Sequence, residues 1–171
     1  MRKKSKYRPK GVRLDNLTWV MSSLKPFDSV EVAVDLRIKN HASLEALRTG
    51  QATRHDMDVL IGAFNMCEGY MRLRDEMGVD WAQEIRAGQD ALLAVSRRGL
   101  ANGDRFICRA DELMAINMTM QIHDAQLDKS TVQDMERALA IVEKDQRHGK
   151  ARVVNVKVPD ETKQPNTVGS S

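Results

Sequence analysis

The hydrophobic residues of this chain recur at helical spacing over most of its length, most clearly between residues 53 and 77. Apolar side chains there fall on two opposite sides of a 3.6-residue period. One stripe holds Met57, Leu60, Ile61, Phe64, Cys67 and Met71. The other holds Val59, Ala63, Met66, Tyr70, Leu73 and Met77. A polar wedge between the stripes is formed by Asp58, Asn65, Arg72 and Glu76. A helix with two apolar stripes packs between neighbours, so this pattern predicts the central helix of a bundle.

Short polar signals mark where this helix and the next one begin and end. Thr53 and Asp56 have the spacing of a capping box, and Gly78 is expected to end the central helix. Asp80 is then expected to cap a helix over residues 81–98, which stops at Gly99. Its predicted inward row is Trp81, Ile85, Leu92 and Val95.

Two more helices are predicted after a turn at residues 99–103. Residues 105–108 form an expected extended piece that carries Phe106 and Ile107 into the core. Asp111 is expected to cap a helix to residue 128, and Ser130 with Gln133 to cap another to residue 148. The helix over 111–128 has two apolar stripes. One consists of Leu113, Ile116, Met120 and Leu127, and the other of Met114, Met118, Ile122 and Ala125. The helix over 130–148 has one inward row, made of Val132, Met135, Leu139 and Val142.

The segment from residue 30 to residue 50 carries two conflicting patterns. Alternation of Val30, Val32, Val34, Leu36 and Ile38 is typical of a strand, yet a helix would place Val30, Val34, Ile38 and Ala42 in one row that continues toward Leu44 and Leu47. No convincing second strand exists to pair with it, and an isolated strand is not stable. We therefore predict a helix that ends at Gly50.

These segments together predict an all-α fold, a compact bundle of about five helices over residues 14–149. A basic N-terminal arm, residues 1–13, precedes it, and a flexible tail, residues 150–171, follows it. Residues 14–26 are expected to form a short helix or an extended lead-in that docks on the core through Trp19. The predicted helices over 53–77 and 111–128 are the central pair.

Composition agrees with one globular domain of 171 residues, since 42% of the residues are apolar and 30% are charged. No apolar run approaches the roughly 20 residues that a membrane-spanning helix needs. No apolar signal segment follows the first charged residues, so a cytoplasmic location is expected. Cys67 and Cys108 lack metal-ligand spacing and are expected to be buried thiols without a disulfide.

The positive charge is concentrated in the arm. The seven cations of the arm are Arg2, Lys3, Lys4, Lys6, Arg8, Lys10 and Arg13, and the remaining 158 residues hold 20 of the 27 cations and all 24 acids, a balance of −4. With Tyr7 available to stack on a base, the arm is a candidate nucleic-acid-binding segment that neutralises phosphates. The alternative is a solvated tail, and both interpretations stay open.

No pattern in the chain indicates catalysis, a cofactor or a metal. His41, His55, His123 and His148 make no metal-binding pair, and no phosphate loop or nucleophile elbow is present. His123 borders an apolar stripe and is expected to be a packed histidine. Asn117, Gln121, Asp124 and Asp128 share one row, which is either a solvated face or a partner-binding strip.

Methionines are the other candidate binding feature. Eight of the ten lie between Met57 and Met135, where they are expected mainly to fill the core. If a helix with two stripes buries only one of them, the other becomes an interface with a partner or with a second copy.

Four segments carry a resemblance to known proteins: KSKYRPKGVRLD, LRIKNHASLEALRTGQATRHDMD, RADELMAINMTMQIHDAQLD and TVQDMERALAIVE. They resemble small uncharacterised proteins encoded by bacteriophages and prophages of proteobacteria, over about residues 3–148. The resemblance assigns no functional residue. It implies a phage-type protein in the host bacterial cytoplasm that binds a host or phage protein without catalysis, or self-associates, with nucleic-acid binding through the arm as the alternative.

Overall fold

The computed structural model describes residues 25–27 and 31–151, which form five α-helices. These are α2 (Glu31–Arg48), α3 (Arg54–Leu73), α4 (Ala82–Ala101), α5 (Ala110–Lys129) and α6 (Val132–Arg147), with the short 3-10 helices η2 (Asp75–Met77) and η3 (Val79–Trp81) between α3 and α4. The predicted all-α bundle is confirmed. The basic arm, Trp19 and all of the predicted tail beyond residue 151 lie outside the described residues.

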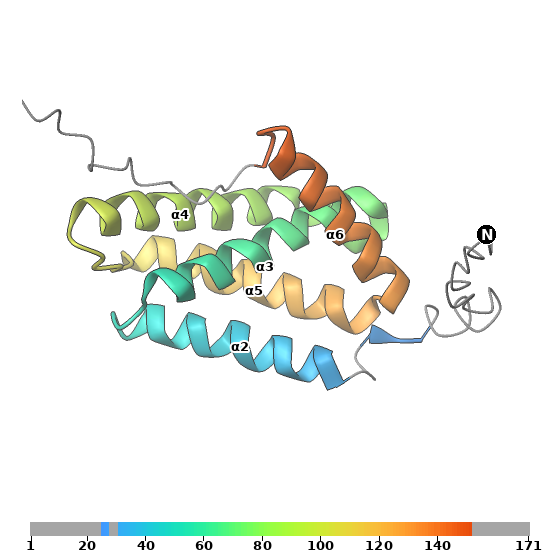
Figure 1. Ribbon diagram of the computed structural model, residues 1–171, viewed down its shortest axis with the longest axis horizontal. Coiled ribbons are helices and arrows are strands. Elements are labelled where there is room, and N and C mark those ends of the chain that lie inside the picture. The colour runs from blue at the N-terminus through green and yellow to red at the C-terminus, as the bar shows by residue number, and fades with distance from the viewer. Residues whose placement is uncertain (1–24, 28–30, 152–171) are drawn as a thin grey trace, which may run out of the picture.

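Helix α3 is the centre of the bundle, as its two apolar stripes predict. It contacts α2, α4, α5 and α6, and Figure 1 shows it crossing α5 while α6 lies across its C-terminal half. Leu60, Phe64 and Cys67 on one side of α3 and Tyr70 further along are completely buried. Asn65, which the sequence pattern places in a polar wedge, is also buried because α3 is covered on nearly every side.

The start of α3 follows the prediction and its end does not. Thr53 and Asp56 form the expected capping box: the Thr53 backbone N–H donates to Asp56 Oδ2 at 2.8 Å, and the Asp56 N–H donates to Thr53 Oγ1 at 3.3 Å. The helix ends at Leu73, four residues before the predicted Met77, and η2 follows it. Gly78 closes η2 with φ of 134°, a conformation that side chains other than glycine rarely adopt.

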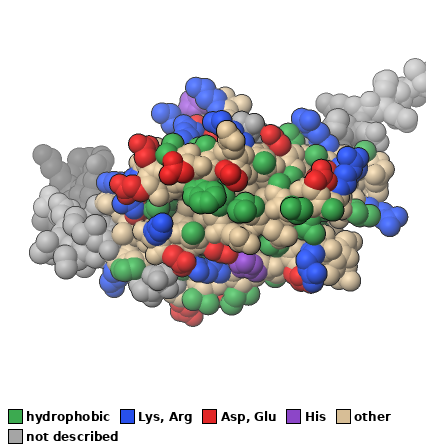
Figure 2. All heavy atoms as spheres, turned by 180° about the vertical axis from the view of Figure 1, so that it is seen from behind, with side chains coloured by type: hydrophobic (Ala, Val, Ile, Leu, Met, Phe, Trp, Pro, Cys, Tyr) green, Lys and Arg blue, Asp and Glu red, His purple; other side chains and the backbone are tan. Residues whose placement is uncertain are grey.

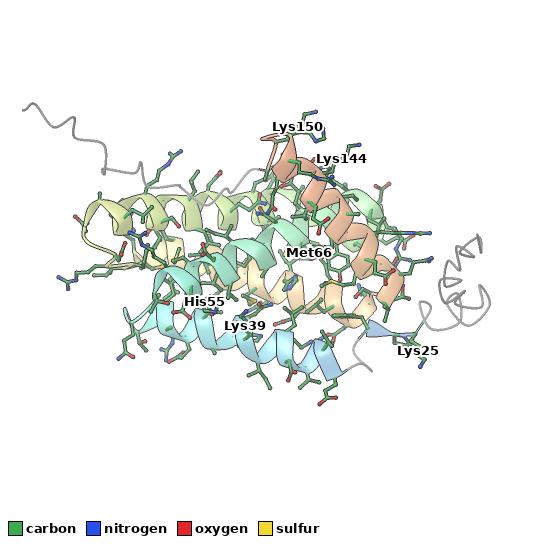
Figure 3. All side chains as sticks on the ribbon, viewed as in Figure 1. Lys25, Lys39, His55, Met66, Lys144 and Lys150 are labelled. Atoms are coloured by element: carbon green, nitrogen blue, oxygen red, sulfur yellow. The ribbon has the colours of Figure 1, made fainter. Side chains whose placement is uncertain are left out.

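The caps of the later helices differ from the predicted ones. Thr131 and Asp134 cap α6, one residue after the predicted pair, because Ser130 is buried and its carbonyl accepts the Phe27 N–H at 2.9 Å. This backbone pairing continues at Lys25, whose carbonyl accepts the Val132 N–H at 3.1 Å (Figure 3). Helix α4 begins after Trp81 without a side-chain cap from Asp80.

Helix α4 also continues past Gly99 to Ala101. Gly99 is required there for space, since a Cβ on it would lie 2.2 Å from Cδ1 of the Phe106 ring. Phe106 is buried as predicted, whereas Ile107 is exposed, because neighbouring side chains of an extended segment point in opposite directions.

For two helices the prediction of which face points into the bundle is wrong. Residues 31–38 are helical, as chosen over the strand, but Val34 and Ile38 are 52% and 63% exposed. The face of α2 that packs on the bundle carries Ala33, Asn40, Ser43 and Leu47. In α6 the predicted Leu139 is 43% exposed, and Ala138 is buried in its place. Polar side chains occupy part of the α2 interface, so hydrophobicity alone does not identify it.

Candidate functional site

The outer face of α5 carries hydrophobic side chains that the described residues do not cover. Met114 and Met118 are 72% and 42% exposed, whereas Ile116 and Met120 on the opposite side of the same helix are buried. Figure 2, which shows the molecule from behind, has a band of hydrophobic side chains across the middle of this face. The second predicted stripe of α5 is therefore mostly a surface feature, although Ile122 is buried.

A groove of about 310 Å³ lies between the C-terminal half of α5 and the turn formed by η2 and η3. Its lining residues are Glu76, Met77, Gly78, Trp81, Met118, Gln121, Ile122, Ala125, Gln126 and Lys129. Trp81 is 50% exposed, so its predicted place in the inward row of α4 is wrong. Because α4 begins after it, Trp81 belongs to η3 and stands in the wall of the groove. The adjacent Val79 is also 50% exposed.

The buried side chain of Gln126 holds the groove in shape. Its Nε2 donates to the Met77 carbonyl at 2.5 Å and to the Cys67 carbonyl at 3.1 Å, which ties the η2 turn and α3 to α5. Met77 forms part of the groove while being only 3% exposed. These two hydrogen bonds fix the η2 turn against α5 on one side of the groove.

The two walls of the groove differ in charge. The η2–η3 turn carries Asp75, Glu76 and Asp80, all exposed, and no Lys or Arg. The α5 wall carries Lys129. None of the three acids takes part in an ion pair with a residue that the structure describes. The turn beside the groove is thus negatively charged, although Glu76 is the one acid among the lining residues and Lys129 lines the groove as well.

The structure separates the polar row predicted as a partner-binding strip. Gln121 lines the groove, and Asn117 is half-buried. Asp124 Oδ2 is 2.9 Å from His41 Nε2, and Asp128 pairs with Arg37, so both carboxylates join α5 to α2. The single row therefore has two environments, and only Gln121 of the four contributes to the groove.

His123 is a packed core histidine, as predicted. Its side chain is among the fully buried ones, and neither ring nitrogen has a hydrogen-bond partner among the described residues. Burial lowers its pKa from 6.5 to about 4, and the positive charges of Arg37 and His41 act in the same direction. The ring is neutral at pH 7, and the structure gives it no partner for acid–base chemistry.

Both cysteines are free thiols, without a disulfide between them. Cys67 is fully buried, and desolvation raises its pKa. Cys108 is only partly buried, and desolvation raises its pKa to about 11, with the Glu112 carboxylate adding to the shift. Neither thiol is activated, because a nucleophilic cysteine needs a lowered pKa.

In the described ranges no group of three or more His, Cys, Asp and Glu side chains could hold a metal ion. No helix within them has the length and apolar character needed to cross a membrane. The arm residues proposed for nucleic acid, from Arg2 to Arg13, lie outside those ranges, so that prediction stays a prediction.

Sequence reasoning identified the methionines of this face as a possible interface but missed the groove. The missing element was the η2–η3 turn, which was assigned to the ends of two long helices. Gly78 predicts the end of the central helix, but no local signal shows that short 3-10 helices lie on both sides of it. No family model, curated protein or solved structure matches this chain.

Proposed function

We propose that this protein is a non-catalytic binding protein whose α5 groove takes an amphipathic, positively charged helix of a partner protein. The observation that carries this proposal is the groove itself, in which the exposed Trp81 and Met118 line an apolar cleft beside an acidic turn. Tryptophan is enriched among the residues that contribute most to protein interfaces, and methionine adapts to varied apolar surfaces.

The shape of the site favours a helix as its ligand. Met114, Met118 and Ala125 follow one another at helical spacing along α5, so their exposed row is straight and parallel to the helix axis. A partner helix with apolar residues at i, i+3, i+4 and i+7 can lie along such a row and insert side chains into a groove. Within the described bundle this apolar row is left uncovered, with Met114 72% and Met118 42% exposed.

The charge of the site favours a basic partner. Glu76 lines the groove, and Asp75 and Asp80 are exposed neighbours in the same η2–η3 turn. Lysine or arginine side chains on the polar edge of a bound helix would complement them and increase the association rate. The same acids disfavour pairing of this groove with the groove of a second copy, so a partner protein fits better than a homodimer through this face.

The resemblance to phage and prophage proteins suggests where such a partner would be met. We place the protein in the host bacterial cytoplasm, bound to a host or phage protein whose action it modulates. This part of the proposal rests on the resemblance alone and names no partner.

A model peptide tests the groove directly. The probe is a 20-residue peptide with leucines at helical spacing and lysines elsewhere, added to full-length protein carrying Trp19→Phe, which leaves Trp81 as the one tryptophan. Binding is expected to shift Trp81 fluorescence to shorter wavelength, because the ring leaves water. Met118→Lys is expected to weaken the peptide affinity about tenfold or more, by placing a cation in the groove.

Three controls make the result specific. A peptide of the same composition in scrambled order removes the apolar stripe, and one with glutamates in place of the lysines reverses the charge. Ile38→Lys makes the same kind of change at another exposed apolar position, on α2, where Ile38 is 63% exposed against 42% for Met118. Equal binding of all three peptides, or equal loss in the Ile38 and Met118 variants, would refute the proposal. Sedimentation of the protein alone shows whether this face joins two copies instead.

A further inference from the structure

A second pocket lies at the other end of α5, where the α4–α5 loop returns to the bundle. Its volume is about 480 Å³, and its lining residues are Arg98, Asn102, Arg105, Ile107, Cys108 and Arg109. Three of these six residues are arginines, whose side chains end in guanidinium groups. This is unexpected for a chain whose residues outside the arm are mildly acidic. The sequence showed no sign of it, because the helix–loop–helix path is what joins Arg98 to Arg105 and Arg109.

Arg98 is the fixed member of this cluster. Its Nη1 donates to Glu112 Oε1 at 2.9 Å, and its Nη2 donates to Glu112 Oε2 at 2.5 Å and to the Ile107 carbonyl at 2.9 Å. The carboxylate holds the guanidinium on the protein side, and this hydrogen bonding raises the pKa of Arg98. Arg98 therefore forms the floor of the pocket, and Glu112 cancels its charge.

Arg105 and Arg109 supply the excess positive charge. Both are exposed, and neither makes an ion pair within the described part of the chain. Asp104, next to Arg105, is already paired with Arg54 at 2.8 Å. The remaining acid nearby is Asp111, which acts electrostatically on Arg98. Two unpaired guanidiniums beside a third that is neutralised leave a site with a surplus of hydrogen-bond donors.

The attraction for an anion comes from the arginine side chains and not from the start of α5. Arg109 is the N-cap residue of that helix, but Glu112 Oε2 already accepts the Arg109 backbone N–H at 2.8 Å, and Asp111 and Glu112 place two carboxylates in the first turn. Guanidinium groups bind phosphate oxygens through paired N–H donors, and Asn102 offers an amide in the same pocket. A phosphate group carries up to about two negative charges at neutral pH, which matches the two unpaired arginines.

We infer that the pocket lined by Arg98, Arg105 and Arg109 binds a phosphate group. The source is either a small phosphate compound or the backbone of a nucleic acid, and the recognition chemistry is the same for both. The site is distinct from the α5 groove, and none of its residues belongs to the basic arm. It belongs to the folded bundle and stands whether or not the groove binds a partner helix.

Cys108 provides a direct readout, because it lines this pocket and Cys67, the other cysteine, is fully buried. The full-length protein is labelled with iodoacetamide, a neutral reagent, at pH 8.5 in phosphate-free buffer of low salt. Inorganic pyrophosphate or a short single-stranded DNA is added at increasing concentration. A ligand in the pocket is expected to slow Cys108 labelling in a saturable way.

The variant that tests the site is Arg105→Gln with Arg109→Gln, since both side chains are exposed and their loss leaves the Arg98–Glu112 pair intact. Each substitution is expected to weaken pyrophosphate protection about tenfold, because it removes a charge-assisted contact. Arg137→Gln is the matched control, an exposed arginine without an ion pair among the described residues. It belongs to α6, which Figure 1 shows at the opposite end of the bundle from the α4–α5 loop. Far-ultraviolet circular dichroism shows that the variants keep their helices.

The two ligands separate the two sources of phosphate. Protection by pyrophosphate alone identifies a small phosphate compound. Protection by the oligonucleotide, lost in the Arg105/Arg109 variant although the arm is unchanged, identifies a nucleic-acid backbone. If neither ligand protects Cys108, or if protection is the same in the double variant and the Arg137 control, the inference is wrong.

Discussion

Gly88 of α4 lies directly against Thr119 of α5. A Cβ placed on Gly88 would be 2.1 Å from Thr119 Oγ1 and 2.7 Å from Thr119 Cβ. Thr119 is fully buried, and its hydroxyl lies 3.0 Å from two carbonyls, that of Ala115 in its own helix and that of Glu84 in α4. The hydroxyl can donate to only one of them at a time. Helices α4 and α5 therefore approach each other closely where α4 has the glycine Gly88 and α5 has the hydrogen-bonded hydroxyl of Thr119.

This close approach predicts that Gly88→Ala destabilises the protein. The added methyl group cannot fit without moving α4 away from α5, and such overpacking costs about 1–3 kcal/mol. The free energy of unfolding in urea measures it. Gly62→Ala on α3 is the matched control, because a Cβ there meets nothing within 4 Å. That change is expected to stabilise the protein by about 0.5–1 kcal/mol, as alanine favours helix. Equal effects at both positions would contradict the packing described.

The buried His123 predicts that stability falls in weakly acidic solution. The unfolded chain binds a proton at this histidine with a pKa near 6.5, whereas the fold binds it only below a pKa of about 4. As pH falls through this interval, the unfolded state takes up the proton first. About 3 kcal/mol of stability is therefore lost between pH 7 and pH 4.

His123→Leu isolates this contribution from that of the carboxylates. The variant cannot be protonated at this position, so its unfolding free energy is expected to decrease less between pH 7 and pH 4. At pH 7 it is expected to be as stable as the unmodified protein or more stable, because the ring nitrogens have no hydrogen bonds to described residues. Parallel pH profiles for the two proteins would show that the fold leaves the pKa of His123 at its unfolded value.

The Arg98–Glu112 pair predicts a different pH dependence. Hydrogen bonding from Arg98 lowers the pKa of the Glu112 carboxyl, so its contribution to stability is present at neutral pH and is lost as pH falls through that lowered value. Glu112→Gln is expected to cost about 2 kcal/mol at pH 7, since it leaves Arg98 without its charged partner. Glu45→Gln, which breaks the exposed pair with Arg48, is expected to have no measurable effect on urea unfolding. A larger loss of unfolding free energy in Glu45→Gln than in Glu112→Gln would contradict this assignment.

The two thiols predict stepwise labelling. In the folded protein only Cys108 is expected to react with iodoacetamide, at a rate that rises with pH toward its pKa of about 11, because the thiolate is the nucleophile. Cys67 is expected to react only after unfolding, when the desolvation that raises its pKa is removed. Mass spectrometry of intact protein counts the labels. Two labels at equal rates under native conditions would place Cys67 at the surface.

Local sequence signals predicted the helices because they act within a few residues. The capping box at Thr53 and Asp56 was found from spacing alone, and so were the inward positions Ile85 and Leu92. Even the ambiguous segment after residue 30 was resolved as helix by the lack of a second strand. The capping box and the inward positions depend on hydrogen bonds and periodicities inside one element, which a sequence displays directly. The choice of helix after residue 30 depends instead on the lack of a pairing strand elsewhere in the sequence.

The site was harder to predict because its parts come from different elements. Met118 was a candidate interface residue from the pattern of α5, but Trp81 was assigned to the core, as large aromatic residues usually are. Its exposure depends on where α4 begins, and this depends on the turn at Gly78. The phosphate pocket required the same kind of information, because Arg98 and Arg109 meet through the path of the α4–α5 loop.

The sequence by itself determined that this chain is an all-α bundle centred on α3, because helix formation depends on local spacing and on the total apolar surface to be buried. Only the tertiary structure decided which faces are covered. Val34 and Ile38 face outward while Asn40 and Ser43 face inward, since α2 is placed by polar pairs such as His41–Asp124 as well as by apolar contact. Burial is a property of the neighbours of a residue, and the helix that carries the residue does not specify them.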